Sequence, residues 1–350
     1  MSTCSMKNIK SFITLHLIGV MNVVILAGGY ATRLWPITMT KAKPLLPVGK
    51  KAIIDHVYEK VSKFGKVFVS TNRRFEDDFR RWARDKDVDL IVEETTREEE
   101  KLGAVRALAE VSKVLNGEML VVAGDNIFSF DLDGFVKYYR EKGCCVVGLY
   151  DVGDFELVKR YSCVEMEGER IVRFYEKPKD PKSTLVGIAI YALPKTAVSL
   201  LQEYVSGNMH SDNLGNFMSW LCERTEVYGY PFTGIWHDVG NADSYLEALR
   251  FYMEHYVDDS AEVGRYSKLI PPVVIDENAR VEGRSIVGPY AYIGKGCVVE
   301  NSDVSESVIF ENSVLRNSKV LRSIVDEDCE IRGLDLSNSI IGMHAKIQRG

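Results

Sequence analysis

The chain lacks the excess of basic residues that a nucleic-acid-binding protein normally carries. Its 350 residues include 44 Lys and Arg against 50 Asp and Glu, which gives a formal net charge of −6. A broad nucleic-acid footprint would need Lys and Arg in excess on one face, so we expect none. Any binding of phosphate groups must therefore be local.

The cysteine pattern excludes two further classes of protein. The seven cysteines are odd in number, none are spaced as Cys-x-x-Cys, and Cys144 and Cys145 lie side by side in an apparent strand. A disulfide framework or a zinc site would need a different pattern. A reducing cytoplasm fits best, and we expect no membrane partner.

The first twenty residues carry only a weak resemblance to a signal peptide. Lys7 and Lys10 precede an apolar run, but that run contains Thr14 and His16 and lacks a small-residue cleavage site. It is also far shorter than a membrane span. We therefore expect no secretion and assign residues 1–20 to an N-terminal extension of no assigned function.

Apolar periodicity predicts an α/β fold in the first part of the chain. With 46% hydrophobic and 27% charged residues, the chain can form a sizeable core and two domains. Strand patterns at 22–28, 66–72, 88–94 and 118–126 alternate with helical patterns at 52–64, 75–84 and 103–115. Such units form a parallel, Rossmann-like sheet flanked by helices, with ligands beyond the carboxyl ends of the strands.

A second architecture is predicted after Pro271 and Pro272. Aliphatic residues recur at a spacing of six, with a small residue two positions before most of them. The aliphatic series begins Ile275, Val281, Val287, Ile293 and Val299. A chance run of short strands is the alternative, but a hexad repeat of this length is typical of a left-handed parallel β-helix. We therefore expect a catalytic domain at 21–258 and a β-helix domain at 271–350.

The stretch from Val23 to Pro47, VVILAGGYATRLWPITMTKAKPLLP, favours the binding of phosphate groups. Gly28 and Gly29 let backbone amides approach an anion, and Arg33 and Lys43 supply positive charge. The stretch is neither a GxGxxG dinucleotide fingerprint nor a P-loop, which needs a GK[ST] ending. Taken alone, the two glycines would indicate only a tight turn.

This stretch closely resembles the signature of sugar-1-phosphate nucleotidylyltransferases, LAGGxGTRL followed by a lysine before LLP. Ala31 stands where that family has its third glycine. The resemblance extends to about Leu249, and the repeat tail resembles the β-helix of longer family members. It implies nucleotide binding by eight residues: Leu26, Ala27, Gly28, Gly29, Thr32, Arg33, Lys43 and Gly103.

The same resemblance assigns the remaining site residues. Asp125 in AGDN and Asp238 in WHDVGN match two aspartates that bind Mg²⁺, and Arg33, Lys43 and Asp125 are the catalytic candidates. The residues expected at the sugar phosphate are Ser162, Glu176, Lys177 and Gly187. Relatives often have glycine at the position of Ser162, which leaves the sugar open. His237, beside Asp238, is interpreted as structural.

The chemistry implied by the resemblance needs no general base. A hexose 1-phosphate attacks the α-phosphorus of a nucleoside triphosphate, and both substrates are already ionised. GDNIF resembles thymidylyltransferases that act on glucose 1-phosphate, whereas IWHDVGNADSYLEA resembles guanylyltransferases that act on mannose 1-phosphate. A uridylyltransferase is a further option, and the acidic run EETTREEEK before Gly103 leaves the base open.

Two alternatives from other classes remain. A hexapeptide-repeat acyltransferase would need a catalytic histidine, and His344 is the only histidine in the repeat. A noncatalytic regulatory subunit is disfavoured because five residues of the family site are all present: Arg33, Lys43, Asp125, Lys177 and Asp238. A β-helix exposes its edges and often a flat apolar face, so we also expect a homo-oligomer assembled at least partly through residues 271–350. The alternative is a tail that packs only on its own domain.

Overall fold

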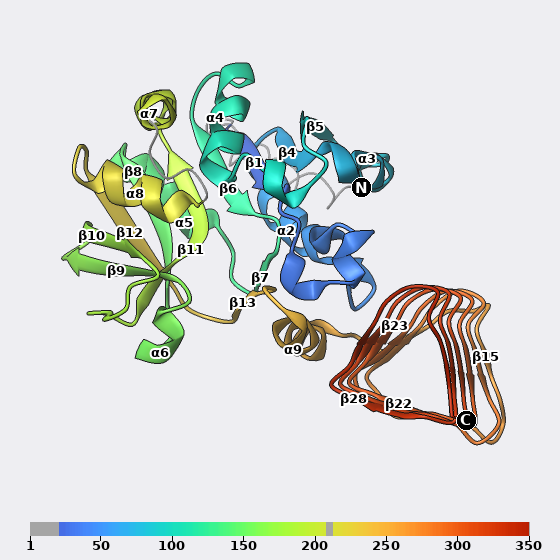
Figure 1. The fold of residues 1–350 in the computed structure, drawn as a ribbon. Helices are drawn as coiled ribbons and strands as arrows, with labels where there is room; N and C mark the ends of the chain where they lie inside the picture. The colour runs from blue at the N-terminus through green and yellow to red at the C-terminus, as the bar shows by residue number, and fades with distance from the viewer. Residues whose placement is uncertain (1–20, 208–212, 350) are drawn as a thin grey trace, which may run out of the picture. The chain divides into compact units, whose positions relative to one another are not determined.

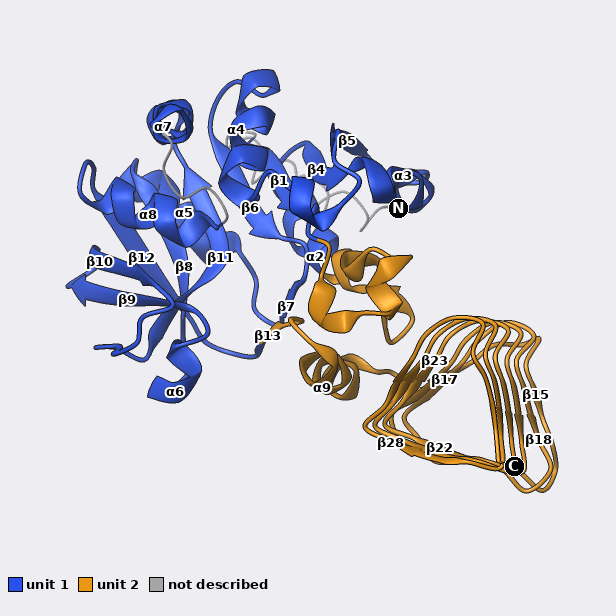
Figure 2. Ribbon diagram, in the orientation of Figure 1, with its two compact units in different colours: residues 1–29, 57–236 blue, residues 30–56, 237–350 orange. Residues whose placement is uncertain are grey.

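The computed structural model describes residues 21–207 and 213–349, which form two compact units. The first unit comprises residues 1–29 and 57–236, and the second comprises residues 30–56 and 237–350 (Figure 2). The predicted N-terminal extension, residues 1–20, lies outside the described residues. No helix within 21–207 or 213–349 is both long and apolar enough to cross a membrane.

The first unit is built on a nine-stranded sheet in the order β5-β4-β1-β6-β11-β8-β12-β10-β9 (Figure 1). The four strands at one end are parallel, as predicted: β1 (Asn22–Leu26), β4 (Val67–Asn72), β5 (Val88–Glu93) and β6 (Met119–Ala123). The other strands form a mixed half: β8 (Cys145–Asp151), β9 (Ser162–Glu167), β10 (Arg170–Glu176), β11 (Leu185–Leu193) and β12 (Val227–Phe232). The Rossmann-like fold is confirmed.

Helices cover both faces of this sheet. Helices α4 (Ala104–Val114), α7 (Lys195–Ser206) and α8 (Leu214–Cys222) share a buried core with one face. On strand β12, Val227 belongs to that core, while Tyr230 packs edge-on against Phe135 of α5 (Asp133–Lys142). Alternate residues of a strand point to opposite faces, so α5 covers the other face.

The remaining elements of the described residues, apart from the β-helix, are four helices, two strand pairs and six 3-10 turns. The helices are α2 (Ile53–Val61), α3 (Glu76–Ala83), α6 (Phe155–Val158) and α9 (Ala242–Tyr252). Two strand pairs are β2 (Pro47–Val48) with β3 (Lys51–Ala52), and β7 (Asn126–Phe128) with β13 (Trp236–Asp238). The 3-10 turns are η1 (Thr32–Leu34), η2 (Ile37–Met39), η3 (Lys43–Leu45), η4 (Ser62–Phe64), η5 (Arg73–Phe75) and η6 (Glu98–Glu100).

The second unit contains the predicted left-handed parallel β-helix, which has a triangular cross-section (Figure 1). The first face is formed by β14 (Tyr256–Val257), β17 (Val273–Ile275), β20 (Ala291–Ile293), β23 (Val308–Ile309), β26 (Ile324–Val325) and β29 (Ile340–Ile341). The second face is formed by β15 (Glu262–Val263), β18 (Arg280–Glu282), β21 (Val298–Glu300), β24 (Val314–Arg316), β27 (Glu330–Arg332) and β30 (Lys346–Gln348). The third face is formed by β16 (Lys268–Leu269), β19 (Ile286–Val287), β22 (Asp303–Ser305), β25 (Lys319–Leu321) and β28 (Asp335–Ser337).

The spacing of six is interrupted where the coils of the β-helix become shorter. Val274 pairs with Tyr292, eighteen residues later, whereas Tyr292 pairs with Val308, only sixteen residues later. Strands of the β-helix are already present at Tyr256, before the predicted boundary at Pro271. The spacing of six in fact extends back to Val257. The domain bounds stay a prediction.

The central strands of the first face of the β-helix, β17, β20, β23 and β26, are buried on both sides. Ile275 and Ile309 point into the coil, whereas Val308 and Ile324 are equally buried but lie outside that inner core. Residues of the same unit pack on this outer side, since a Cβ placed on Gly342 would lie 2.9 Å from Cγ of Pro36. The apolar face is therefore covered within the chain, and the expected homo-oligomer stays a prediction.

We expect Ile309→Ala to lower the free energy of unfolding by about 3 kcal/mol, because it empties a fully buried position inside the coil. Ile286→Ala is the matched control, since Ile286 is 38% exposed on the third face, and it should cost less than about 1 kcal/mol. Denaturant unfolding measures both. Equal losses would contradict the assignment of these residues to the inside and the outside of the coil.

Candidate active site

The turn after β1 is fixed by hydrogen bonds to both neighbouring strands. The amide of Ala27 donates to the carbonyl of Ser70 at 2.8 Å, and the amide of Gly124 donates to the carbonyl of Leu26 at 2.8 Å. Asn72 Nδ2 donates to the carbonyl of Gly28 at 2.9 Å. Because Asn72 is fully buried, this bond holds the turn firmly, and Gly29 remains exposed.

Gly28 leaves room for a half-buried carboxyl group. A Cβ on Gly28 would lie 3.1 Å from Oε1 of Glu93, the last residue of β5. Burial raises the pKa of Glu93 from 4.5 to about 7, although a hydrogen bond from the amide of Leu102 partly offsets this shift. Glu93 therefore binds a proton in the folded protein at a pH where an exposed glutamate is ionised.

Gly103 lies at the start of α4, directly after Leu102. Its φ of 81° is a left-handed conformation that a residue with a side chain rarely adopts. The N-terminus of α4 carries the positive end of the helix dipole and no acidic residue in its first turn. The turn at Gly28, the carboxyl of Glu93 and the start of α4 therefore lie at one edge of the parallel strands.

The acidic run before Gly103 is mostly engaged with its own neighbours. Lys101 pairs with Glu98 at 2.7 Å, and the amide of Thr96 donates to Glu100 at 3.1 Å. Most side chains of this run are exposed. These contacts favour the interpretation of the run as a solvated surface.

Asp125 follows β6, the strand next to β1. Its Oδ1 accepts a hydrogen bond from Asn126 Nδ2 at 2.9 Å, and Asn126 Oδ1 in turn accepts from Trp236 Nε1 at 2.7 Å. Asp125 is half-buried. Among the described residues, no group of three or more His, Cys, Asp or Glu could hold a metal ion unaided.

Three of the residues predicted at the sugar phosphate are brought together by the sheet. Ser162 on β9 is paired in register with Glu176 on β10 and with Gly187 on β11. The hydroxyl of Ser162 donates to Oε2 of Glu176, while Lys177 Nζ lies 3.8 Å from Oε1 of the same carboxylate. A Cβ on Gly187 would lie 2.7 Å from Cζ of Phe174, so only glycine fits there.

The cationic loop, residues 30–46, belongs to the second unit and carries Thr32, Arg33 and Lys43. It opens at Ala31, which adopts a left-handed conformation with φ of 50°. The glycine that the family has at this position would adopt that conformation without strain. Thr32 and Arg33 are exposed, and Lys43 is half-buried in η3.

Asp238 and His237 also belong to the second unit. Burial lowers the pKa of His237, and its ring packs 4.8 Å from that of Phe251. A half-buried, packed imidazole agrees with the structural interpretation. Asp238 ends β13, and its carbonyl accepts a hydrogen bond from the amide of Gly240 at 2.9 Å.

Sequence analysis missed four residues that shape these regions. Asn72 holds the glycine turn, Glu93 lies beside Gly28, and Lys41 is treated below. Gly215 is the second residue of α8, where any Cβ would collide with Oε2 of Glu176 and lie 2.7 Å from Oγ of Ser162. Glu93 could have been predicted, because an acidic residue at the end of a strand pattern can be recognised in the sequence. No local sequence pattern predicts the role of Gly215.

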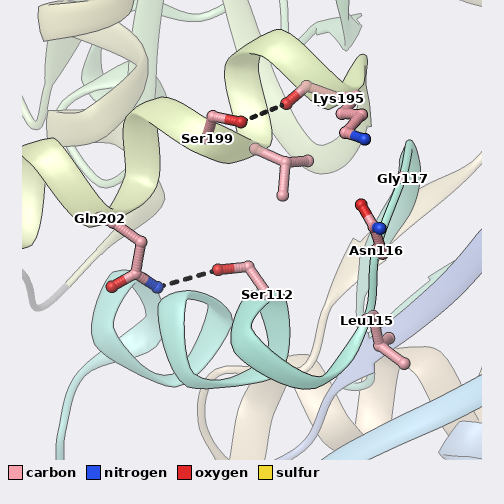
Figure 3. A pocket seen from close by; sticks show the side chains of 8 residues that line it. Ser112, Leu115, Asn116, Gly117, Lys195, Ser199 and Gln202 are labelled. Atoms are coloured by element: carbon pink, nitrogen blue, oxygen red, sulfur yellow. Dashed lines mark hydrogen bonds between the residues drawn. The ribbon is translucent and has the colours of Figure 1, made fainter.

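A separate cavity lies between α4 and α7 in the first unit and has a volume of about 280 Å³ (Figure 3). Its lining is mainly polar and consists of Ser112, Leu115, Asn116, Gly117, Lys195, Val198, Ser199 and Gln202. None of these is a predicted site residue. Gln202 donates to the hydroxyl of Ser112 at 3.0 Å, so part of this lining is already paired.

We expect Glu93→Gln to remove a pH dependence of stability. The pKa of Glu93 is about 7 in the folded protein and about 4.5 in the unfolded chain. The contribution of its protonated form to the free energy of unfolding is therefore complete below pH 4.5 and is lost as pH rises through about 7. Across this window the melting temperature of the wild type should fall relative to that of the variant. Exposed Glu99→Gln is the control, and parallel curves for wild type and Glu93→Gln would contradict the buried carboxyl.

Comparison with known proteins agrees with this geometry. Residues 22–255 match the nucleotidyl transferase family model, and residues 269–350 match the model of the GMPPB C-terminal domain. A protein of Sulfolobus acidocaldarius named as a mannose-1-phosphate guanyltransferase is 31% identical over 278 residues, which are 76% of this chain and 74% of that protein. The bifunctional protein GlmU of Methanococcus vannielii is 25% identical over 321 residues, covering 84% of this chain and 74% of that protein.

The fold comparison gives the same result. A solved structure from Bacillus anthracis, described as a glucose-1-phosphate thymidylyltransferase in complex with a sucrose, superposes with a TM-score of 0.60. It is 25% identical and covers 69% of this chain and 98% of its own. The family match spans well over half of the chain and includes the glycine turn, Asp125 and the Ser162–Glu176 pair. The chain belongs to the nucleotidyl transferase family.

Proposed function

We propose that this protein forms a nucleotide sugar and pyrophosphate from a nucleoside triphosphate and a hexose 1-phosphate. An oxygen of the sugar phosphate attacks the α-phosphorus, a new P–O bond forms, and the bond to the β-phosphate oxygen breaks. The electron pair leaves with pyrophosphate. No proton needs to move, because the attacking phosphate is already ionised at pH 7.

One observation carries this proposal. The Gly28–Gly29 turn and Asp125 follow the carboxyl ends of the adjacent parallel strands β1 and β6, and Gly103 begins the helix that leads into β6. Ligands of such sheets bind beyond these strand ends. Backbone amides of a glycine turn and a helix N-terminus are suited to the phosphates and the base of a nucleotide.

Charge decides the roles of the side chains. Both substrates are anions that repel each other, so bound cations must offset their approach. We assign Arg33 and Lys43 to the triphosphate and Lys177 to the sugar phosphate. Glu176 is assigned to the sugar hydroxyls, since a carboxylate accepts hydrogen bonds from them.

Asp125 and Asp238 would hold a divalent metal ion, which we propose to be Mg²⁺. Two carboxylates suit Mg²⁺, because this ion commonly keeps several waters and substrate phosphates in its coordination shell. When bound, the ion would supply positive charge to the phosphates.

Among the possible substrates, we propose GTP and mannose 1-phosphate. The 31% identical relative is named as a mannose-1-phosphate guanyltransferase, and the C-terminal model is that of GMPPB. A thymidylyltransferase acting on glucose 1-phosphate is the second candidate, since the structural neighbour is described as one.

A pyrophosphate-release assay over a grid of nucleoside triphosphates and hexose 1-phosphates tests the proposal. We expect the highest kcat/KM for GTP with mannose 1-phosphate and loss of turnover in EDTA. A preference for dTTP with glucose 1-phosphate would replace the proposed substrates but keep the reaction. No pyrophosphate from any pair would refute the reaction itself.

Arg33→Ala and Lys43→Ala should each lower kcat/KM roughly a hundredfold, since one preorganised charge contact contributes about 3 kcal/mol in the transition state. Arg33 is exposed and Lys43 half-buried, so circular dichroism should show a folded protein in both cases. Arg265→Ala and Lys319→Ala are matched controls on exposed residues of the second unit. Near wild-type kcat/KM in either site variant would show that its phosphate assignment is wrong.

A further inference from the structure

Lys41 lies in the cationic loop, two residues before Lys43, but its side chain is directed to the β-helix. Its Nζ lies 2.6 Å from Oδ1 of Asp326 and 2.9 Å from Oε1 of Glu327, and it sits 5.1 Å from the centre of the Phe310 ring. The Lys41 side chain is only 18% exposed. All of these residues belong to the second unit.

Asp326 is a fixed part of the β-helix frame. It directly follows β26 and is 1% exposed, its amide donates to the carbonyl of Ile341 at 2.9 Å, and its Oδ1 also accepts from the amide of Glu327 at 2.9 Å. Its Oδ2 has no hydrogen-bond partner within the described part of the chain. A buried carboxylate left without an opposite charge is strongly unfavourable, so Lys41 compensates Asp326.

A third carboxyl group belongs to the same cluster. Burial and the neighbouring Glu327 raise the pKa of Glu311, one coil earlier, and Lys41 acts against that rise. Burial lowers the pKa of Lys41, but its hydrogen bonds to Asp326 and Glu327 outweigh this effect, and the net shift is upward. Lys41 therefore stays charged among three acidic side chains of the β-helix.

The cationic loop has little structure of its own with which to fix its position. Within residues 30–46 the structure forms only η1, η2 and η3, each of three residues. Such short 3-10 pieces are weak on their own. Ala42 alone separates Lys41 from Lys43; it is 1% exposed, and its carbonyl accepts a hydrogen bond from Leu45 at 2.9 Å.

We propose that Lys41, Asp326 and Glu327 are positioning residues, through which the β-helix holds the cationic loop and thereby sets the placement of Arg33 and Lys43. The catalytic part of this inference rests on the proposed function, because it takes Arg33 and Lys43 as phosphate ligands. The structural part, that the acidic cluster holds the loop, does not depend on any activity.

Hydrogen exchange of the full-length protein tests the structural part. Lys41→Met and Asp326→Asn should speed amide exchange within residues 30–46 roughly tenfold or more while leaving β17, β20 and β23 protected. Lys295→Met is the matched control, because Lys295 forms an ion pair of 2.6 Å with Glu277 on the β-helix and both partners are exposed. Unchanged exchange of the loop in both variants would overturn the proposal, whatever their activity.

Steady-state kinetics separates positioning from a loss of folded protein. A smaller folded fraction lowers kcat alone, whereas a misplaced loop should also raise KM for the nucleoside triphosphate, with kcat/KM falling roughly ten- to a hundredfold. Lys41→Arg, which keeps the charge, should restore most of this loss. An unchanged KM in Lys41→Met and Asp326→Asn would overturn the positioning role.

Two further outcomes remain decisive. If Lys41→Met does not fold, Glu327→Gln is the second variant, because it removes only the second contact of Lys41 at a partly exposed side chain. Faster amide exchange of the loop in Glu327→Gln would support the proposal. Unchanged exchange there and in Asp326→Asn would refute it. If the wild type releases no pyrophosphate, the proposed function fails, but the exchange data still decide whether the β-helix holds the loop.

Discussion

The glycine turn at the end of β1 depends on hydrogen bonds that join it to both neighbouring strands. The amide of Ala27 and the carbonyl of Leu26 are bonded to Ser70 and Gly124, so the turn inherits the rigidity of a parallel sheet buried on both faces. The side chain of Asn72 also donates a hydrogen bond to the carbonyl of Gly28. Preorganised amides stabilise an anion without reorganising, and this sheet edge supplies the preorganisation.

Arg33 and Lys43, which are proposed to bind the substrate phosphates, are not held in place by a sheet. Arg33 and Lys43 lie on a loop of short 3-10 turns, whose order comes from contacts outside the loop. The β-helix supplies one such contact at Lys41, and the hydroxyl of Tyr245 on α9 donates to the carbonyl of Pro47 at 2.7 Å, just beyond the loop. A repeat that buries aliphatic residues internally gives a rigid frame for this purpose.

Much of this organisation could be predicted from the sequence, because it follows from local patterns. The parallel βα units and the hexad repeat are periodic, and the repeat extends back to Val257 because Val263 and Leu269 keep the same spacing. Lys41 and Asp326, in contrast, are 285 residues apart, and no periodicity connects them. Gly215 meets Glu176 only because α8 packs against β10, so its role depends on tertiary structure.

Ser162 occupies part of the carboxylate that is proposed to bind the sugar. Relatives with glycine at this position would leave both oxygens of the Glu176 carboxylate available to sugar hydroxyls. Here the hydroxyl of Ser162 donates to Oε2 of Glu176, and Lys177 lies 3.8 Å from Oε1. In the proposed site, where Glu176 accepts hydrogen bonds from sugar hydroxyls, the serine takes up one of the lone pairs that this carboxylate would otherwise offer them. Because a hydrogen bond to a charged group is worth about 1.5 to 3 kcal/mol, the proposed site would discriminate between hexoses that differ at one hydroxyl bound by Glu176.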